Sequence, residues 1–253
     1  MTLTELRKKL DSREIGAVEL AQDYLKKIKE RDTLINSYIT VCEEEAIEMA
    51  KKAQSVIDAG ESKPLTGIPV SIKDNICTDG VRTTCASHML EDFVPVYDAT
   101  AVAKLKADNF VMLGKTNMDE FAMGGSSQTS YFGGQKNPYN TDCVTGGSSG
   151  GAAASVAAGL CAAALGSDTG GSVRQPSAFC GVTGLKPTYG TVSRWGLIAF
   201  ASSLDQIGVV ANSAEDTAYV LNAIYGYDEN DATTSQKSMG DYTSMVGEDI
   251  SKL

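Results

Sequence analysis

Two serines in glycine-rich turns are the residues of this sequence best suited to covalent chemistry. Ser148 and Ser172 each follow a Gly-Gly pair, and they lie 24 residues apart. Sixteen of the 25 glycines fall within residues 124–196, which indicates backbone that turns sharply or approaches another group closely. Two tight turns in a buried sheet would explain this pattern as well as a nucleophile would. A base beside the serines would favour the interpretation that one of them is a nucleophile.

A serine nucleophile needs a base, and the sequence contains a single histidine, His88. The motif Gly146-x-Ser148-x-Gly150 matches the nucleophile elbow of α/β-hydrolases, but that fold places its histidine after the serine, whereas His88 precedes it. No Ser-x-x-Lys motif of β-lactamases occurs, and neither Gly-x-x-x-x-Gly-Lys-[Ser/Thr] nor Gly-x-Gly-x-x-Gly is present to bind a nucleotide. A lysine is the remaining candidate base.

Lys73 ends the stretch 67–73, in which Val70 and Ile72 alternate with polar residues as in a strand. Its side chain could extend past the strand end into solvent. Alternatively the ammonium is buried, and desolvation lowers its pKa until it acts as a base. In that case Lys73, Ser148 and Ser172 can form a relay, in which the lysine takes a proton from one serine and that serine takes one from the other.

The elements that must position these residues follow from apolar periodicity and from capping motifs such as Thr2-x-x-Glu5. The predicted helices span about 2–10, 17–29, 43–59, 98–106 and 213–224. A strand at 110–114 follows the fourth helix, and this order is typical of the crossover units of a largely parallel sheet. Without repeats or linkers, the chain is predicted to be one α/β domain, with a helical layer at about 1–60 and a catalytic core at about 65–210.

Composition narrows the class of protein. The 253 residues are 42% hydrophobic and 21% charged, as in an ordinary globular protein, and the net charge of −10 argues against this chain alone binding a phosphate backbone. No apolar run reaches the roughly 18 residues of a membrane span, and the N-terminus lacks a signal peptide, so a cytoplasmic protein is expected. The six cysteines form no Cys-x-x-Cys pair and are expected to be reduced; no metal site is predicted.

The motifs resemble the amidase signature family of Ser-Ser-Lys hydrolases and, within it, the A subunits of tRNA-dependent amidotransferases. The resemblance rests on residues 73–75, 117–126, 146–151, 168–176, 184–190 and 199–208. It spans nearly the whole chain but only the first half of a full-length A subunit. It implies a mixed, largely parallel central sheet covered by helices, a C-terminally truncated domain, and poor activity of the chain by itself.

The resemblance also assigns roles to individual residues. It makes Ser172 the nucleophile, Ser148 the bridging serine and Lys73 the base, and it implies a cis peptide between Gly147 and Ser148. The backbone amides of the oxyanion hole would come from Thr169, Gly170, Gly171 and Ser172. Met123 and Gly124 would line the substrate site. Two departures from the family's pattern are Thr145 and Val209, which stand where proline is usual.

The function implied by the resemblance is release of ammonia from glutamine or asparagine through an acyl-enzyme. In a heterotrimer, the B subunit would use the ammonia to amidate misacylated tRNA with ATP and magnesium, the C subunit would brace the complex, and this chain itself would hold no cofactor. Most side chains that grip the amino acid would lie in the second half of the family's sequence. A stand-alone amidase acting on another small amide, and an inactive fragment, remain alternatives.

Overall fold

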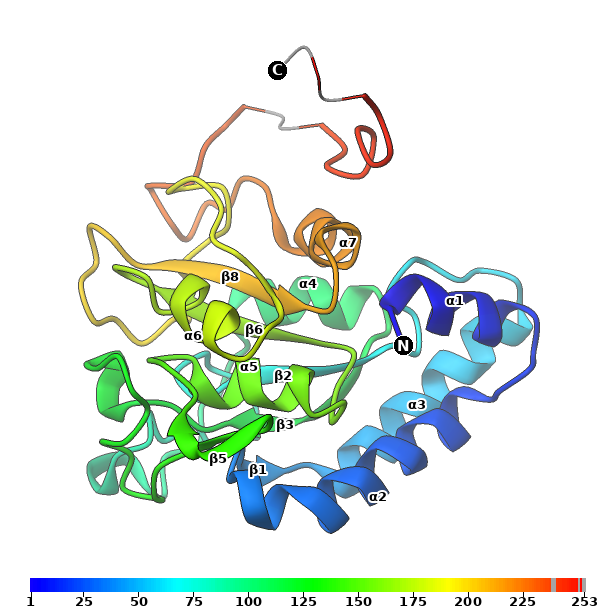
Figure 1. The fold of residues 1–253 in the computed structure, drawn as a ribbon. Helices are drawn as coiled ribbons and strands as arrows, with labels where there is room; N and C mark the ends of the chain where they lie inside the picture. The colour runs from blue at the N-terminus through cyan, green and yellow to red at the C-terminus, as the bar shows by residue number, and fades with distance from the viewer. Residues whose placement is uncertain (238–239, 250, 252–253) are drawn as a thin grey trace.

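A mixed six-stranded sheet forms the centre of the molecule, as seen in the computed structural model, which describes residues 1–237, 240–249 and 251 (Figure 1). The strand order is β1-β3-β2-β6-β8-β7. The strands are β1 (Tyr38–Val41), β2 (Pro69–Lys73), β3 (Val111–Thr116), β6 (Ala163–Asp168), β7 (Thr183–Leu185) and β8 (Gln206–Ala211). β2 pairs in parallel with both β3 and β6, and the other three pairings are antiparallel. The mixed α/β sheet predicted from the sequence is confirmed.

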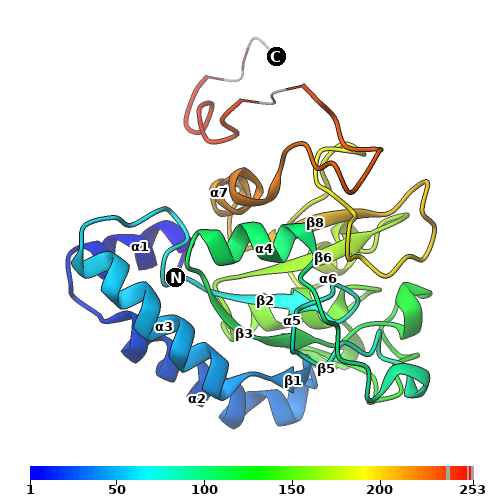
Figure 2. The same cartoon turned by 180° about the vertical axis from the view of Figure 1, so that it is seen from behind.

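Helices cover both faces of this sheet. They are α1 (Leu3–Asp11), α2 (Ala17–Ile35), α3 (Glu43–Asp58), α4 (Thr100–Ala107), α5 (Gly150–Ala157), α6 (Arg174–Phe179) and α7 (Ala214–Ile224). α5 and α6 lie on the face turned to the viewer in Figure 1, and α4 lies on the opposite face, which Figure 2 brings to the front. β2, β3, β6 and β8 are buried along their whole lengths, so Lys73 lies on one of the most enclosed strands and the turn of Ser172 follows another.

The helix boundaries differ from the predicted ones at one notable place. α2 continues to Ile35 instead of ending near residue 29, because no residue before Asn36 stops it. Asn36 takes the left-handed conformation (φ 60°) and its N–H caps the carbonyl of Asp32. The capping box of Thr2 and Glu5 at the start of α1 is formed as predicted.

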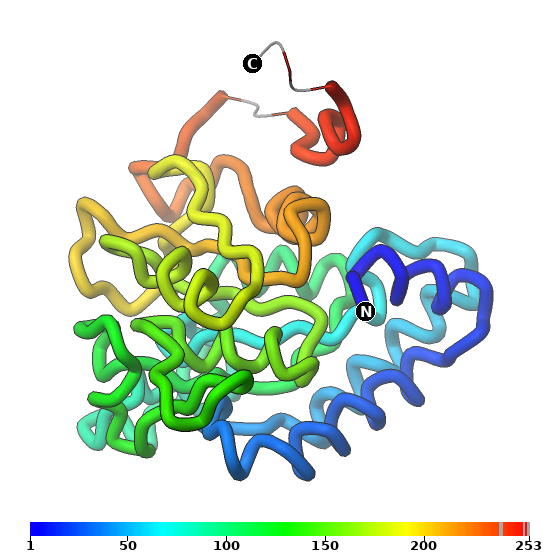
Figure 3. The backbone as a smooth tube through the Cα atoms, viewed as in Figure 1, coloured from blue at the N-terminus to red at the C-terminus, as the bar shows by residue number. Residues whose placement is uncertain are grey.

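A two-stranded hairpin and a C-terminal segment complete the described chain. β4 (Lys136–Asn137) and β5 (Asn140–Val144) pair antiparallel just before the first Gly-Gly-Ser turn. After α7 the chain runs back over that helix, as the trace in Figure 3 shows, and the ring of Tyr242 packs 5.3 Å from that of Tyr225. No helix among the described residues is long and apolar enough to cross a lipid bilayer. All six cysteines are free, and Cys143 alone is exposed.

Candidate active site

Lys73 lies at the carboxyl end of β2, and its side chain is completely buried. Its Nζ is 2.7 Å from Ser148 Oγ, 2.8 Å from Ser149 Oγ and 2.9 Å from Ser167 Oγ. Burial lowers the pKa of Lys73 to about 7, although the carboxylates of Asp119 and Asp168 oppose this effect. Of the two alternatives that the sequence left open, the structure therefore shows the buried amine.

Ser148 sits in the tight turn between β5 and α5, with its side chain fully buried. The peptide bond from Gly147 to Ser148 is cis, as the resemblance implied. Gly146 has φ 75°, and a Cβ there would lie 2.9 Å from the Cα of Pro176, so this position excludes a side chain on both grounds. The small residues of α5 have a related role: a Cβ on Gly151 would lie 2.4 Å from the carbonyl oxygen of Asn117.

Ser172 lies in the second Gly-Gly-Ser turn, between β6 and α6, and is 9% exposed. The N–H of Ser149 donates to the carbonyl of Ser172 (3.0 Å), which holds the two turns side by side. In the described part of the chain, no hydrogen bond joins the Ser148 and Ser172 hydroxyls. The structure thus places Lys73 in contact with Ser148, and the turn that carries Ser172 lies directly beside the turn that carries Ser148.

The Asp168 carboxylate organises the turn that carries Ser172. It accepts the N–H groups of Gly171 (2.7 Å) and Val173 (3.0 Å), and Arg174 binds it through both Nε (3.1 Å) and Nη2 (3.0 Å). Burial raises the pKa of Asp168, but these hydrogen bonds, that from Arg174 foremost, outweigh burial and lower the pKa to about 2. The turn is therefore built around a carboxylate that stays ionised.

The four backbone amides expected in the oxyanion hole do not all point the same way. The Gly171 N–H is already bound to Asp168. Among the described residues, the N–H groups of Thr169, Gly170 and Ser172 donate to no protein acceptor. Gly170 is exposed and Thr169 partly so. Of the four predicted amides, the three without an acceptor in the described part of the chain stay candidates for the oxyanion hole.

Met123 and Gly124 lie on an exposed loop that forms a wall beside the first Gly-Gly-Ser turn. Gln175 connects this loop to the turn, because its Nε2 donates to the Gly125 carbonyl (3.0 Å) and its Oε1 accepts the Gly147 N–H (2.9 Å). The position of this loop is compatible with the prediction that Met123 and Gly124 line a substrate site.

Comparison with known proteins agrees with this geometry. A family model described as "Amidase" matches residues 19–253. The chain belongs to the amidase family. The A subunit of the glutamyl-tRNA(Gln) amidotransferase of Lachnoclostridium phytofermentans is 54% identical over 255 residues, and that of Ruminiclostridium cellulolyticum is 57% identical over 251. The alignments cover 100% and 99% of this chain but 52% of each relative, so the chain spans about half the length of the relatives it matches.

Solved structures of other amidases show the same architecture. The glutamyl-tRNA(Gln) amidotransferase A subunit from Thermotoga maritima superposes with a TM-score of 0.86 at 48% identity, over 97% of this chain and 51% of that one. Peptide amidase from Stenotrophomonas maltophilia gives a TM-score of 0.92 at 37% identity, over 97% and 53%. This amidase therefore shares its fold with family members that carry different names.

Sequence reasoning missed the residues that orient the Lys73 amine. The Ser149 hydroxyl donates to the Ser167 carbonyl (3.1 Å), and Asn75 Nδ2 donates to Ser167 Oγ (3.0 Å). Asn75 and Ser149 belong to the family motifs, and this membership was the signal in the sequence that could have pointed to them. Their hydrogen-bond partners come from segments that the fold alone brings together.

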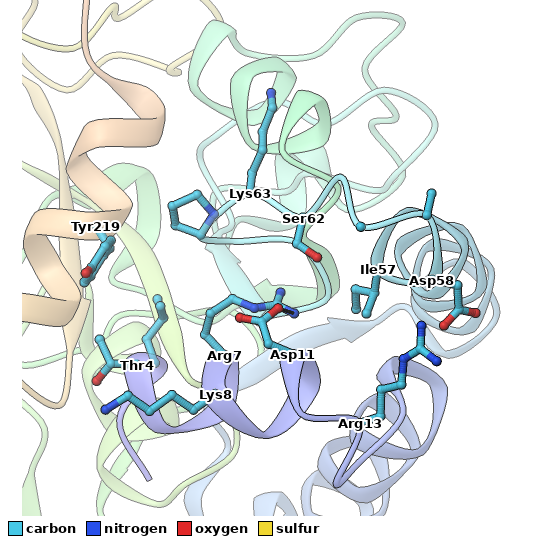
Figure 4. A pocket seen from close by; sticks show the side chains of 14 residues that line it. Thr4, Arg7, Lys8, Asp11, Arg13, Ile57, Asp58, Ser62, Lys63 and Tyr219 are labelled. Atoms are coloured by element: carbon cyan, nitrogen blue, oxygen red, sulfur yellow. Dashed lines mark ion pairs between the residues drawn. The ribbon is translucent and has the colours of Figure 1, made fainter.

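A separate cavity of about 760 Å³ lies between α1, the turn after α3, and Tyr219 of α7 (Figure 4). Basic side chains line it, but Arg7 forms an ion pair with Asp11 (2.7 Å) and Lys63 one with Asp108 (3.1 Å). None of the three candidate catalytic residues lines this cavity. The volume of this cavity therefore does not identify it as the candidate active site.

Proposed function

We propose that this amidase cleaves a carboxamide with Ser172 as nucleophile, Ser148 as proton bridge and Lys73 as base. The observation that carries the proposal is the 2.7 Å contact between Lys73 Nζ and Ser148 Oγ in a completely buried site. A lysine with a pKa of about 7 is neutral in much of the population near neutral pH, so it can accept a proton.

The hydrogen bonds of the lysine are compatible with Ser148 as its proton donor. A neutral amine has two N–H groups and one lone pair. Ser149 Oγ and Ser167 Oγ lie at 2.8 and 2.9 Å, and the Ser149 proton is committed to the Ser167 carbonyl. If the two N–H groups point to these oxygens, the lone pair is left for the Ser148 hydroxyl.

The reaction then runs in two halves. When substrate binds, the Ser172 hydroxyl turns toward Ser148 and attacks the carboxamide carbon, while its proton passes to Ser148 and the Ser148 proton to Lys73. The N–H groups of Thr169, Gly170 and Ser172 stabilise the tetrahedral oxyanion. Its collapse breaks the C–N bond, and the relay returns a proton so that ammonia leaves. Water, activated by the same relay, hydrolyses the acyl-enzyme.

The substrate we propose is glutamine, or asparagine, with the ammonia used to amidate misacylated tRNA. The support is the 54–57% identity to proteins named as the A subunit of glutamyl-tRNA(Gln) amidotransferase. The B and C subunits would then be partners in a cytoplasmic complex, with tRNA, ATP and magnesium bound by the B subunit. The net charge of −10 is consistent with tRNA contacts made by a partner.

The test is ammonia release from glutamine by the chain assembled with the B and C subunits. Ser172→Ala is expected to abolish glutamine-dependent amidation but to leave amidation by added ammonia intact, because free ammonia bypasses the acyl-enzyme. Ser203→Ala, at an exposed serine, is the matched control. Substantial glutamine turnover by Ser172→Ala would refute the assignment of the nucleophile.

A stand-alone amidase is the second candidate, and the likeness to peptide amidase favours it (TM-score 0.92). The two are separated by comparing glutamine with a C-terminally amidated peptide as substrate, without partner subunits. Ammonia release from the peptide alone would support the second candidate.

A further inference from the structure

Asp119 is a buried carboxylate that the proposed reaction does not use. It follows β3 and directly precedes the short 3-10 helix Glu120–Ala122, and its side chain is completely buried. Oδ2 accepts the Ser127 N–H (3.0 Å) and Oδ1 accepts the Thr129 hydroxyl (3.0 Å). Its carboxylate thereby anchors the end of the loop that forms the wall of the site.

The same residue also contacts the turn that carries Ser148. The Asp119 N–H donates to the Ser148 carbonyl (3.2 Å). A Cβ on Gly147 would lie 2.1 Å from Asp119 Oδ2, and a Cβ on Gly124 would lie 2.3 Å from Asp119 Cγ. Neither glycine has a positive φ, so both are required for the space that the carboxylate occupies rather than for backbone conformation.

We propose that Asp119 is a positioning residue, which clamps the Ser148 turn against the loop 124–129 and places a carboxylate beside the turn that presents Ser148 to Lys73. This inference rests on the roles proposed for Lys73 and Ser148. It explains why a charged side chain fills the space between two glycines where an apolar residue would pack without the cost of burying a charge.

The charges around Lys73 single out Asp119. Burial lowers the pKa of Lys73, and the groups that raise it are, in order, Asp119, Asp168, Cys85 and Asp205. Asp168 is paired with Arg174, whereas within the described ranges Asp119 has no cationic partner. Asp205 accepts the Thr169 hydroxyl and the Phe200 and Ala201 N–H groups. Asp119 is thus the foremost counter-charge, and unlike Asp168 it has no arginine partner among the described residues.

The charge is tested with Asp119→Asn in the 253-residue chain, with Glu120→Gln as matched control. Glu120 is the next residue along and only partly buried, and its carboxylate accepts the Ser87 hydroxyl (2.6 Å). With isotope-labelled lysine, the Cε resonance of Lys73 is identified by its loss in Lys73→Met and titrated by NMR. Asp119→Asn is expected to lower the pKa of Lys73 by about one pH unit, and Glu120→Gln to leave it in place. Equal midpoints in the two variants would overturn the proposal.

A measurement on the unsubstituted chain covers the case in which Asp119→Asn does not fold. The Cγ resonance of Asp119 should then show an inflection at the pH where Lys73 titrates, because each group senses the charge of the other. A flat trace through that pH would overturn the electrostatic role.

The clamp is tested by thermal unfolding. Gly124→Ala is expected to lower Tm by about 3–10 °C through overpacking against Asp119. Gly125→Ala is the control, since a Cβ there meets nothing closer than 3.8 Å. In an Asp119→Ala background the penalty of Gly124→Ala should disappear, and an equal penalty in both backgrounds would contradict the clamp. None of these readouts needs turnover, so they stay informative if glutamine hydrolysis itself is not found.

Discussion

The molecule contains two completely buried lysines on neighbouring strands, Lys73 on β2 and Lys115 on β3, and they differ in what surrounds the amine. Lys115 Nζ donates to the Ile76 carbonyl (2.7 Å) and the Thr83 hydroxyl (2.6 Å) and lies 3.9 Å from the Asp74 carboxylate. Lys73 Nζ lies among three serine hydroxyls, with no carboxylate in ion-pair range among the described residues. Burial lowers the pKa of both and carboxylates oppose this effect at both, but among the described residues only Lys115 has a carboxylate within ion-pair range.

The comparison shows that burial alone does not make a lysine a base. The neighbours of Lys115 accept hydrogen bonds and include a carboxylate, so they favour its protonated form, and its amine braces the residues that follow β2. Lys73 can lose its proton because hydroxyls bind either form of the amine. Substitution of Lys73 should therefore lower activity and not stability, whereas substitution of Lys115 should lower stability and not activity.

The largest expected effect is on turnover at Lys73. Lys73→Met, and Lys73→Arg with its permanently protonated guanidinium, should lower kcat for glutamine-dependent ammonia release by about 10²–10⁴-fold. The free energy of unfolding, by contrast, should not fall. Folding lowers the pKa of Lys73, so the unfolded chain binds the proton more tightly than the folded chain does. This difference destabilises the wild-type fold, most strongly below about pH 7. Lys73→Met should therefore unfold at an equal or higher urea concentration than wild type at pH 6.5; a large loss of stability would contradict the comparison.

Lys115→Met should show the reverse pattern. Removing one partner of a buried pair leaves Asp74 uncompensated, and the expected loss of unfolding free energy is about 3–5 kcal/mol, measured by urea denaturation. Activity per folded molecule should persist. Adding Asp74→Asn should recover part of the stability, and failure to do so would show that the two side chains do not act as a pair.

Next in size is the pH dependence of activity. Lys73 must be neutral to accept a proton, so kcat/KM should rise by about tenfold per pH unit below pH 7 and level off above it. Initial rates of ammonia release between pH 5 and 9 measure this. A rise that continues to pH 10 would mean that Lys73 keeps its ordinary pKa and that burial does not make it a base.

The smallest effect is expected at Ser149, which accepts one of the lysine N–H groups. Ser149→Ala removes the hydrogen bond from the lysine, worth about 1 kcal/mol, together with the bonds between its hydroxyl and the Ser167 backbone, so kcat should fall about fivefold with KM little changed. Ser155→Ala, a buried serine of α5 whose hydroxyl bonds to the Ala152 carbonyl (2.9 Å), is the control. A dead Ser149→Ala enzyme would instead assign Ser149 a direct part in proton transfer.

Periodicity and caps predicted most helices and a largely parallel sheet, and the Gly-Gly-Ser turns singled out Ser148 and Ser172. The mixed sheet and the roles of Lys73, Ser148 and Ser172 were implied by the family resemblance. The relay hypothesis required a buried Lys73, but the strand pattern alone did not decide this, since a strand-ending lysine also fits solvent until the neighbouring strands are known. Sequence reasoning missed Asp119 and Lys115, whose partners come from separate segments of the chain. The end of α2 at Ile35 was missed because a left-handed asparagine is a weak stop signal.

The distribution of thiols offers a practical handle on the first Gly-Gly-Ser turn. Five of the six cysteines are buried, and Cys143 is exposed on β5, five residues before Ser148. A maleimide dye at stoichiometric concentration should therefore react with the native chain at that one position, without any engineered cysteine. A fluorophore at Cys143 would be attached to the hairpin next to the turn that carries Ser148. Its emission and quenching could then report the binding of an amide substrate or of a protein partner in real time.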